Sequence, residues 1–422
     1  MKRLFCLFLT LALSACSGQT TQLSSYELPR SVDVTFSALL PQDTPAGEQI
    51  FLVLLDDVTG LALNTQPIAM HSTGEQSVSL KMSVPQGSLL KYRYMRQGAA
   101  GSANEAAADG AAIEFRAFYV DGPGHVAHDM VAAWTDMRVE QETGQVSGQL
   151  TAADGSPLAN MVVVAAGLQT RTDPEGQFVL PGLLQGLHNV LAYSANGSQR
   201  TFQQGALVAA HSDTPATIEV QPSSLATVTF WLTPPADHTA GTPVFLTGNL
   251  DSLAARPLMI SQADGRYGLI LQLPTGVDIR YKYTLGDGLW NAEHLADGSF
   301  LLRQLIIPDG TSELEIHDQA VSWSAGSAAP IWFELQAPVD NLLAYVQFKL
   351  GDWSTPLPMW PLGPGHWAYR LNSPTNFAQM LEYRYCLDPA CTVLDSAGIR
   401  SVEGNQPQLQ EIRDVVAGWQ SE

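Results

Sequence analysis

The sequence predicts an all-β protein: a tandem array of four antiparallel β-sandwich domains behind a short N-terminal leader. Gly 35 and Pro 26 make up about one in seven of the 422 residues, which suits many short strands joined by turns. Beyond the leader, no stretch shows the apolar spacing of a long amphipathic helix. Three short blocks that recur in a fixed order set the number of domains.

The charge balance limits the partners. Lys+Arg 21 against Asp+Glu 41 gives a net charge of −20, which repels phosphate groups. Nucleic acid and anionic lipid surfaces are therefore excluded as partners. The composition also excludes a membrane transporter, a coiled coil and a disordered tail. We expect a monomer, and the sequence points to no cofactor and no metal.

The N-terminus is a targeting segment. A basic start precedes the apolar run Leu4–Leu13, which is too short to span a bilayer. The following Leu13-Ser14-Ala15-Cys16 resembles the lipobox of bacterial lipoproteins. That resemblance implies a signal peptide at 1–15, lipid on Cys16, a tether at 16–30, and a membrane-anchored protein on the extracytoplasmic cell surface. The alternative is an ordinary signal peptide cut at the same bond.

The remaining cysteines agree with export. Cys6 leaves with the signal peptide and Cys16 is the expected lipid site, so two cysteines remain, Cys386 and Cys391. In an oxidising compartment this C-x4-C pair is expected to close a small disulfide loop. A metal site would need two further ligands at similar spacing, and none lies nearby in the sequence.

Three blocks repeat in order along the chain: an alternating strand, a Tyr-basic-Tyr strand, and an Asp followed five residues later by Trp. The distance from the Phe of the first block to the first Tyr is 56, 51 and 50 residues. An Arg precedes each closing Asp. The pattern predicts modules at 31–137, 226–324 and 330–420, in which the Trp closes the core and the Tyr pair packs on a sheet face. The blocks are Val34-Thr35-Phe36, Val228-Thr229-Phe230 and Ile331-Trp332-Phe333; Tyr92-Arg93-Tyr94, Tyr281-Lys282-Tyr283 and Tyr383-Arg384-Tyr385; and Asp129/Trp134, Asp318/Trp323 and Asp414/Trp419, with Arg116, Arg303 and Arg400.

A different unit lies between the first two modules, at 143–222. Its Thr172-Asp173-Pro-Glu-Gly176-Gln-Phe178 segment follows a T-D-x-x-G-x-F pattern, in which a tight turn directs Phe178 inward. This unit resembles the carboxypeptidase-regulatory-like, transthyretin-like domain. The resemblance implies a seven-stranded sandwich with a structural role and no chemistry of its own.

The three repeated modules resemble the starch-binding modules of carbohydrate-binding family 20. The second copy has a strand ending in Gly248, a Pro274-Thr275-Gly276 turn, the Tyr281-Lys282-Tyr283 strand and then Trp290. The third copy has Gly351-Asp352-Trp353. In that family two surface tryptophans stack on glucose rings, whereas no single copy here carries both.

The resemblance implies a sugar site built on exposed tryptophans. An aromatic ring covers the C–H face of a pyranose while nearby polar groups bind its hydroxyls. The alternative for each tryptophan is packing, above all for the last two of the set, which flank a turn. The candidate carbohydrate-binding residues are Lys282, Trp290, Asn291, Glu293, Trp353, Trp360 and Trp367.

The sequence contains no motif for catalysis: no metalloprotease, nucleophile-elbow, P-loop or dinucleotide pattern appears. His125 and His128 beside Asp129 could suggest a metal site, but His317 takes the place of His128 in the second copy and Arg413 takes it in the third, which favours a structural role at a strand edge. The predicted function is a surface-anchored, non-catalytic lipoprotein that binds α-glucan or another polysaccharide. The alternatives are a structural stalk or interaction protein, and the accessory region of a larger glycoside hydrolase.

Overall fold

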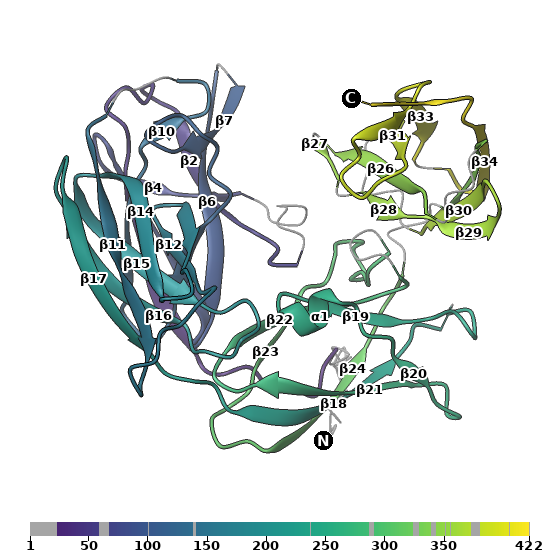
Figure 1. Ribbon diagram of the computed structural model, residues 1–422, viewed down its shortest axis with the longest axis horizontal. Helices are drawn as coiled ribbons and strands as arrows, with labels where there is room; N and C mark the ends of the chain where they lie inside the picture. The colour runs from purple at the N-terminus through teal and green to yellow at the C-terminus, as the bar shows by residue number, and fades with distance from the viewer. Residues whose placement is uncertain are drawn as a thin grey trace, which may run out of the picture.

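The computed structural model describes residues 23–58, 67–99, 101–137, 141–236, 238–286, 291–323, 329–338, 343–350, 352–354, 356–372, 380–404 and 406–421. These residues form β-strands throughout, with one short helix, which confirms the all-β prediction. We number the four domains in chain order: module 1 (31–137), module 2 (143–222), module 3 (226–324) and module 4 (330–420). Figure 1 shows modules 1 and 2 side by side, module 3 below them and module 4 at the C-terminal end. No helix within the described ranges has the length and apolar character needed to cross a bilayer.

Module 1 contains two sheets, ordered β4-β5-β1-β9 and β10-β7-β6-β2-β3, with β8 paired to β6. Buried residues alternate along β1, so Val34 and Phe36 point into the core between the sheets. Its strands are β1 (Ser31–Leu39), β2 (Gln49–Leu54), β3 (Ile68–Ala69), β4 (His71–Gly74), β5 (Ser77–Pro85), β6 (Leu89–Gly98), β7 (Gly101–Ala106), β8 (Arg116–Tyr119), β9 (Val126–Met130) and β10 (Ala133–Trp134).

Module 2 has sheets ordered β14-β11-β17 and β13-β12-β15-β16, which enclose a core that includes Phe178. The backbone of Gly176 has φ 75°, which the tight turn before Phe178 requires. Its strands are β11 (Thr143–Ala152), β12 (Val162–Ala165), β13 (Leu168–Arg171), β14 (Gln177–Leu184), β15 (Gly186–Tyr193), β16 (Phe202–Val208) and β17 (Asp213–Val220).

Module 3 has sheets ordered β20-β21-β18-β24 and β19-β22-β23. The alternating strand β18 directs Val228 and Phe230 into its core. Its elements are β18 (Leu225–Thr233), β19 (Phe245–Gly248), α1 (Asp251–Ala254), β20 (Ile260–Ser261), β21 (Tyr267–Pro274), β22 (Asp278–Thr284), β23 (Arg303–Ile306) and β24 (Glu313–Gln319).

Module 4 has sheets ordered β29-β30-β25-β34 and β27-β26-β31-β32-β35, with β28 paired to β26 and β33 to β31. Its strands are β25 (Ile331–Gln336), β26 (Tyr345–Leu350), β27 (Asp352–Trp353), β28 (Leu357–Pro358), β29 (Trp360–Gly363), β30 (His366–Leu371), β31 (Met380–Cys386), β32 (Val393–Asp395), β33 (Arg400–Glu403), β34 (Gln410–Val415) and β35 (Trp419–Ser421).

Strand pairing differs from the purely antiparallel expectation at the same place in every module. The first long strand runs parallel to a strand near the module's end: β1 with β9, β11 with β17, β18 with β24, and β25 with β34. Each parallel pair brings the start and the end of a module together in one sheet. Such a pair needs a long connection, which the intervening strands supply.

The Tyr-basic-Tyr strands and the closing Asp form one buried polar cluster in modules 1, 3 and 4. In module 3, Tyr281 and Tyr283 both donate their hydroxyl hydrogens to Asp318, at 2.9 and 2.7 Å. Arg303 lies 3.2 Å from Asp318 and 2.8 Å from Glu293. Burial raises the pKa of each tyrosine well above 10, and the Asp318 charge adds to the effect, so both remain donors.

The corresponding residues repeat this arrangement in the other two modules. The two tyrosines of module 1 donate to Asp129 at 2.7 and 2.8 Å, and those of module 4 donate to Asp414 at 2.8 and 2.9 Å. Arg116 pairs with Glu105 and Arg400 with Asp395. Of the closing tryptophans, Trp134 is fully buried, Trp323 is buried and Trp419 packs partly buried against its core.

The N-terminal segment is part of module 3. Ser24 forms an isolated antiparallel β-bridge with Asp318, and the Ser25 amide donates to the His317 carbonyl at 2.9 Å. The Leu23 carbonyl accepts a hydrogen bond from Arg303 at 2.8 Å. The sequence predicted this stretch as a free tether to module 1. It instead extends the exposed edge of β24, whose backbone groups are available for pairing.

Candidate carbohydrate-binding surfaces

Lys282 joins two modules and is not available to a sugar. Its side chain is fully buried, its ammonium forms an ion pair with Asp56 of module 1, and it lies 5.1 Å from the ring centre of Phe300. The sequence placed Lys282 on a basic outer face of the Tyr-Lys-Tyr strand, and that face is covered by module 1. The role of Lys282 in sugar binding is therefore corrected to a junction role.

More charges surround this junction. Lys91 lies 3.2 Å from Asp57, Arg280 lies 3.0 Å from Asp278, and the Leu89 amide donates to Asp278 at 2.8 Å. Burial raises the pKa of Asp57, although Lys91 and Arg280 oppose the rise. Among the contacts that cross the junction are the Lys282–Asp56 ion pair and the hydrogen bond from Leu89 to Asp278, and separating the modules would leave these buried charges without partners.

Asn291 and Glu293 are also committed to structure. The Asn291 side chain donates to the Arg370 carbonyl at 2.9 Å and accepts from the Asn372 amide at 2.8 Å, which ties module 3 to module 4. Glu293 is fully buried and accepts from Arg303. Neither polar group faces solvent, so both predictions of sugar contacts are corrected. Trp290 lies outside the described residues.

Trp367 belongs to the core of module 4. It has no exposed surface and packs among Leu335, Phe348 and their neighbours between the two sheets. A ring without an open face cannot stack on a sugar. The packing alternative for this tryptophan holds, and its assignment to the binding site is corrected.

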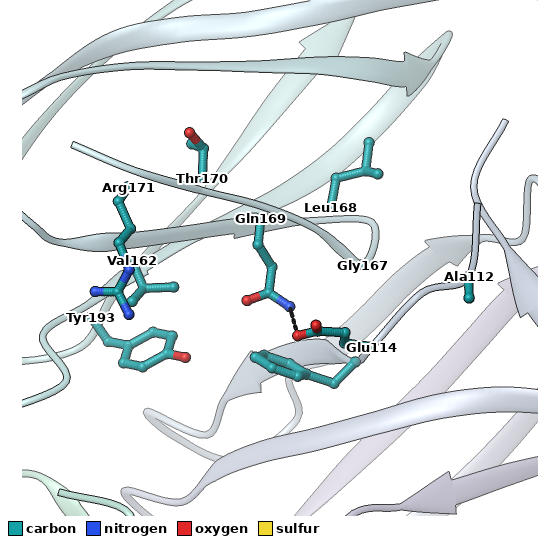
Figure 2. A pocket seen from close by; sticks show the side chains of 10 residues that line it. Ala112, Glu114, Val162, Gly167, Leu168, Gln169, Thr170, Arg171 and Tyr193 are labelled. Atoms are coloured by element: carbon teal, nitrogen blue, oxygen red, sulfur yellow. Dashed lines mark hydrogen bonds between the residues drawn. The ribbon is translucent and has the colours of Figure 1, made fainter. Parts of the chain in front are cut away.

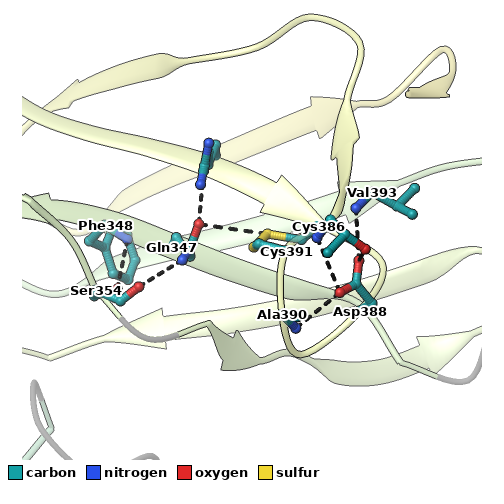
Figure 3. The surroundings of a disulfide bond; sticks show 10 residues. Gln347, Phe348, Ser354, Cys386, Asp388, Ala390, Cys391 and Val393 are labelled. Carbon is teal, nitrogen blue, oxygen red and sulfur yellow. Dashed lines mark hydrogen bonds between the residues drawn. A yellow bond between two sulfur atoms is a disulfide. The ribbon is translucent and has the colours of Figure 1, made fainter. Parts of the chain in front are cut away.

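Trp353 is half-buried beside a polar cluster at the outer face of the β26–β31 sheet. Its indole lies 4.4 Å from the Arg384 guanidinium and 5.9 Å from the Lys349 ammonium. Arg384 donates to Gln347 at 2.8 Å, and Gln347 donates to the Ser354 carbonyl at 2.7 Å (Figure 3). Strand β27 thus places the ring of Trp353 next to hydrogen-bonding groups that have fixed partners.

The predicted disulfide is confirmed. Cys386 at the end of β31 is bonded to Cys391, with the two Cα atoms 5.1 Å apart. Asp388 closes the loop by accepting from the amides of Ala390 and Val393 at 3.0 and 2.8 Å (Figure 3). The crosslink holds the end of the strand that carries Arg384.

Trp360 and Trp332 form an aromatic pair on the other sheet of module 4. Trp360 in edge strand β29 lies opposite Ala368, and Trp332 in β25 lies opposite Arg370, so both side chains start from the same face. Their ring centres are 6.4 Å apart. Trp332 is half-buried, and Trp360 is 44% exposed although its ring also stacks on that of the buried Tyr369, with ring centres 6.2 Å apart. The pair therefore presents apolar ring surface to solvent.

Hydrogen-bonding groups border this pair. His366 contacts Glu334 at 2.7 Å, and Arg413 lies 3.7 Å from the same carboxylate. The register places Glu334 opposite Ala368, on the face that carries the two indoles. Apolar rings next to donors and acceptors are the combination that a pyranose requires.

The sequence analysis did not select Trp332. Its neighbours Ile331 and Phe333 are both fully buried, and strand side chains alternate between faces. The alternation of side chains in the Ile-Trp-Phe block therefore already indicated that Trp332 points outward. The block was predicted as an alternating strand, but its outward residue was not considered as a surface for sugar.

No protein-family model and no curated protein matches the chain. Among solved structures it is similar to the Bacillus anthracis TIE protein (11% identity, 92% of this chain and 68% of that chain, TM-score 0.19). It is also similar to the glycoside hydrolase family 15 glucoamylase from Hypocrea jecorina (19% identity, 26% and 18%, TM-score 0.19) and to a streptococcal ancillary pilin (12% identity, 68% and 99%, TM-score 0.23). At such TM-scores, the assignment of the fold rests on the sheets described above.

Proposed function

We propose that the chain is a non-catalytic carbohydrate-binding protein of the cell surface, anchored through lipid on Cys16, and that module 4 contacts the polysaccharide. The observation that carries this proposal is the pair of half-buried Trp332 and exposed Trp360, bordered by Glu334 and His366. Trp353 on the opposite sheet adds a second, smaller ring surface. The resemblance to starch-binding modules favours an α-glucan as the ligand.

The chemistry of the pair favours a weak, sugar-directed contact. Each indole that stacks on a pyranose ring contributes about 1–2 kcal/mol, in the range of a modest interface anchor. Hydrogen bonds to Glu334 and His366 then fix the hydroxyl groups, and each adds on the order of 1 kcal/mol. One such surface is expected to bind with a dissociation constant of ~0.1–1 mM.

Titration calorimetry of the full chain with soluble starch, maltoheptaose and β-glucans tests the proposal. Trp332→Ala and Trp360→Ala should each weaken binding about tenfold, because one stacking contact is lost. Ile270→Ala is a matched control: this exposed apolar side chain lies on module 3 and should not affect binding. Unchanged affinity in both tryptophan variants, or no binding of any glycan, would contradict the proposal.

The anchor is tested separately. Cys16→Ser should abolish incorporation of labelled fatty acid and release the protein from the membrane fraction, because the thiol is the expected acylation site. Labelling that persists in the variant would refute lipidation at this residue.

A structural or interaction role is the second candidate. The observation in its favour is the use of Lys282 and Asn291 at junctions, which shows that module faces serve to build the array. If every tryptophan variant leaves glycan binding and all partner interactions unchanged, this candidate replaces the first.

A further inference from the structure

Modules 1 and 2 share a rigid interface. Leu89 and Ala117 of module 1 pack with Val162, Val164 and Leu191 of module 2. At its edge, the Gly167 turn (φ 84°) lies against Ile113 so closely that a Cβ there would come within 2.4 Å of that side chain. Gln203 exchanges hydrogen bonds with the backbone of Tyr119 at 3.1 and 2.7 Å. Side chains at this edge therefore have fixed relative positions.

A pocket of about 630 Å³ opens at this edge and draws its walls from both modules (Figure 2). Glu114 and Phe115 come from the loop before β8, Gln169 and Arg171 from β13, and Tyr193 from β15. The volume lies within the usual range of small-molecule sites. Arg171 and Tyr193 both lie opposite Val162 in the sheet, so they share one face.

Aromatic rings line the inner side of the pocket. Phe115 and Tyr193 are both half-buried, and the Lys91 ammonium lies 4.8 Å from one ring centre and 5.6 Å from the other. Lys91 is itself paired with Asp57. The two rings are thus held against the charged junction of modules 1 and 3, and a ligand on them would contact a fixed apolar floor.

Three planar polar groups border the rings. Within the described part of the chain, the Arg171 guanidinium has no ion-pair partner and contacts the oxygens of Asn160 at 3.2 and 3.3 Å. Glu114 accepts from Gln169 at 3.3 Å, as Figure 2 shows. A guanidinium offers paired donors, a carboxylate paired acceptors, and an amide one of each. Such groups suit vicinal hydroxyls, and the charges of Arg171 and Glu114 balance.

From this combination we propose that the pocket between modules 1 and 2 binds a short neutral saccharide. The pyranose C–H face lies on Phe115 and Tyr193, and its hydroxyls bind Arg171, Gln169 and Glu114. The site shares no residue with the Trp332–Trp360 surface of module 4. Both surfaces are proposed to bind saccharides, but binding at one can be lost while binding at the other remains.

The test uses the full chain carrying Trp332→Ala, Trp353→Ala and Trp360→Ala, which removes both ring surfaces of module 4. Saturation-transfer NMR and calorimetry with a panel of gluco-, galacto- and manno-disaccharides should still detect binding. Adding Arg171→Gln should weaken it at least about tenfold, because a charge-assisted donor is lost. Adding Ala112→Trp, which fills the pocket at an exposed lining position, should abolish it.

Arg266→Gln is the matched control, because this arginine is similarly exposed on module 3 and should leave binding unchanged. Unaltered amide exchange in β12 and β15 shows that each variant keeps the interface intact. The proposal is overturned if no disaccharide binds in the background that lacks all three tryptophans, or if binding survives both Arg171→Gln and Ala112→Trp. If the starting protein binds starch but the background binds no disaccharide, the module 4 surface stands and the pocket does not.

Discussion

Replacing Arg303 with methionine tests the buried cluster that recurs in three modules. Its guanidinium donates to Glu293 at 2.9 and 2.8 Å, to the Leu23 and Gln319 carbonyls at 2.8 Å each, and lies 3.2 Å from Asp318. The side chain is 5% exposed and both carboxylates are fully buried. Arg303→Met keeps most of the volume but leaves two buried carboxylates without their cation, a change that costs about 3–5 kcal/mol.

The loss should depend on pH in a defined direction. Burial raises the pKa of Glu293, and Arg303 opposes the rise. Without Arg303 the pKa rises further above its unfolded value of about 4.3. A carboxyl group whose pKa is higher in the folded than in the unfolded state binds protons more tightly in the native state. The unfolding free energy therefore falls as the pH rises from the unfolded pKa through the folded pKa. The deficit of Arg303→Met should therefore be largest at neutral pH and shrink toward pH 5.

Native-state amide exchange in β22 and β24 at pH 7.5 and pH 5.5 measures this local free energy. Two controls bracket the effect. Arg303→Lys keeps the positive charge but loses the paired N–H donors of the guanidinium. Arg266→Met removes a solvent-exposed ion pair with Asp264, so it should change the stability little. A deficit below about 1 kcal/mol, or an equal deficit at both pH values, would refute the reasoning.

Three further predictions concern the junctions and module 4. Lys282→Met should weaken the contact between modules 1 and 3 by about 3 kcal/mol, seen as faster exchange of the Leu89 amide, because a buried ion pair is broken; unchanged exchange there would contradict it. Burial, with help from the Lys282 charge, lowers the pKa of His294 to about 4, so its stabilising contribution is present above pH ~6.5 and lost as the pH falls toward 4. Urea midpoints of His294→Phe should accordingly be less acid-sensitive than those of the starting protein. Cys386→Ser with Cys391→Ser should cost about 2 kcal/mol from loop entropy, measured by exchange in β31, and an unaltered rate would count against it.

Strand alternation and the repeated blocks made most of the fold predictable from the sequence. Phe36, Phe230 and Phe333 each meet the first tyrosine of their Tyr-basic-Tyr strand edge-on, at 4.9, 5.3 and 4.9 Å. Because these contacts join residues about 50 positions apart in every copy, their spacing was visible without a structure. Pattern matching therefore found the residues whose partners lie at a constant distance along the chain.

The carboxylates that complete the cluster were missed because their distance along the chain from the arginine is not constant. Glu105 precedes its arginine by 11 residues and Glu293 by 10, but Asp395 precedes Arg400 by 5. In the third copy Asp395 lies on the equivalent strand: β32 pairs with β31 and β35, as β7 pairs with β6 and β10 in module 1. The segment between the carboxylate and the arginine is shorter, so no fixed spacing marks the residue. Only the three-dimensional pairing shows that the three carboxylates have one role.

The errors at the predicted sugar site have a different cause. Lys282 looked available because its strand alternates basic and aromatic residues, yet its partner Asp56 lies 226 positions away in another module. Asn291 likewise binds backbone 79 and 81 positions ahead. Local sequence shows which way a side chain points from its own sheet and not what covers that sheet. Burial between modules is therefore invisible to a module-by-module reading.

The junctions also decide where ligand binding is expected to concentrate. In module 3 the face that holds Lys282 and Arg280 is covered by module 1, so a free copy of module 3 would expose charges that the full chain buries. In module 4 the Trp332–Trp360 face has no such cover from the described residues, and Trp360 remains exposed. A buried charged face therefore joins module 3 to module 1, and an apolar cluster joins module 1 to module 2, whereas the uncovered face of module 4 is the one that we propose to bind a polymer. Binding should accordingly be measured on the full chain, because an isolated module 3 would present a surface that the assembled protein does not have.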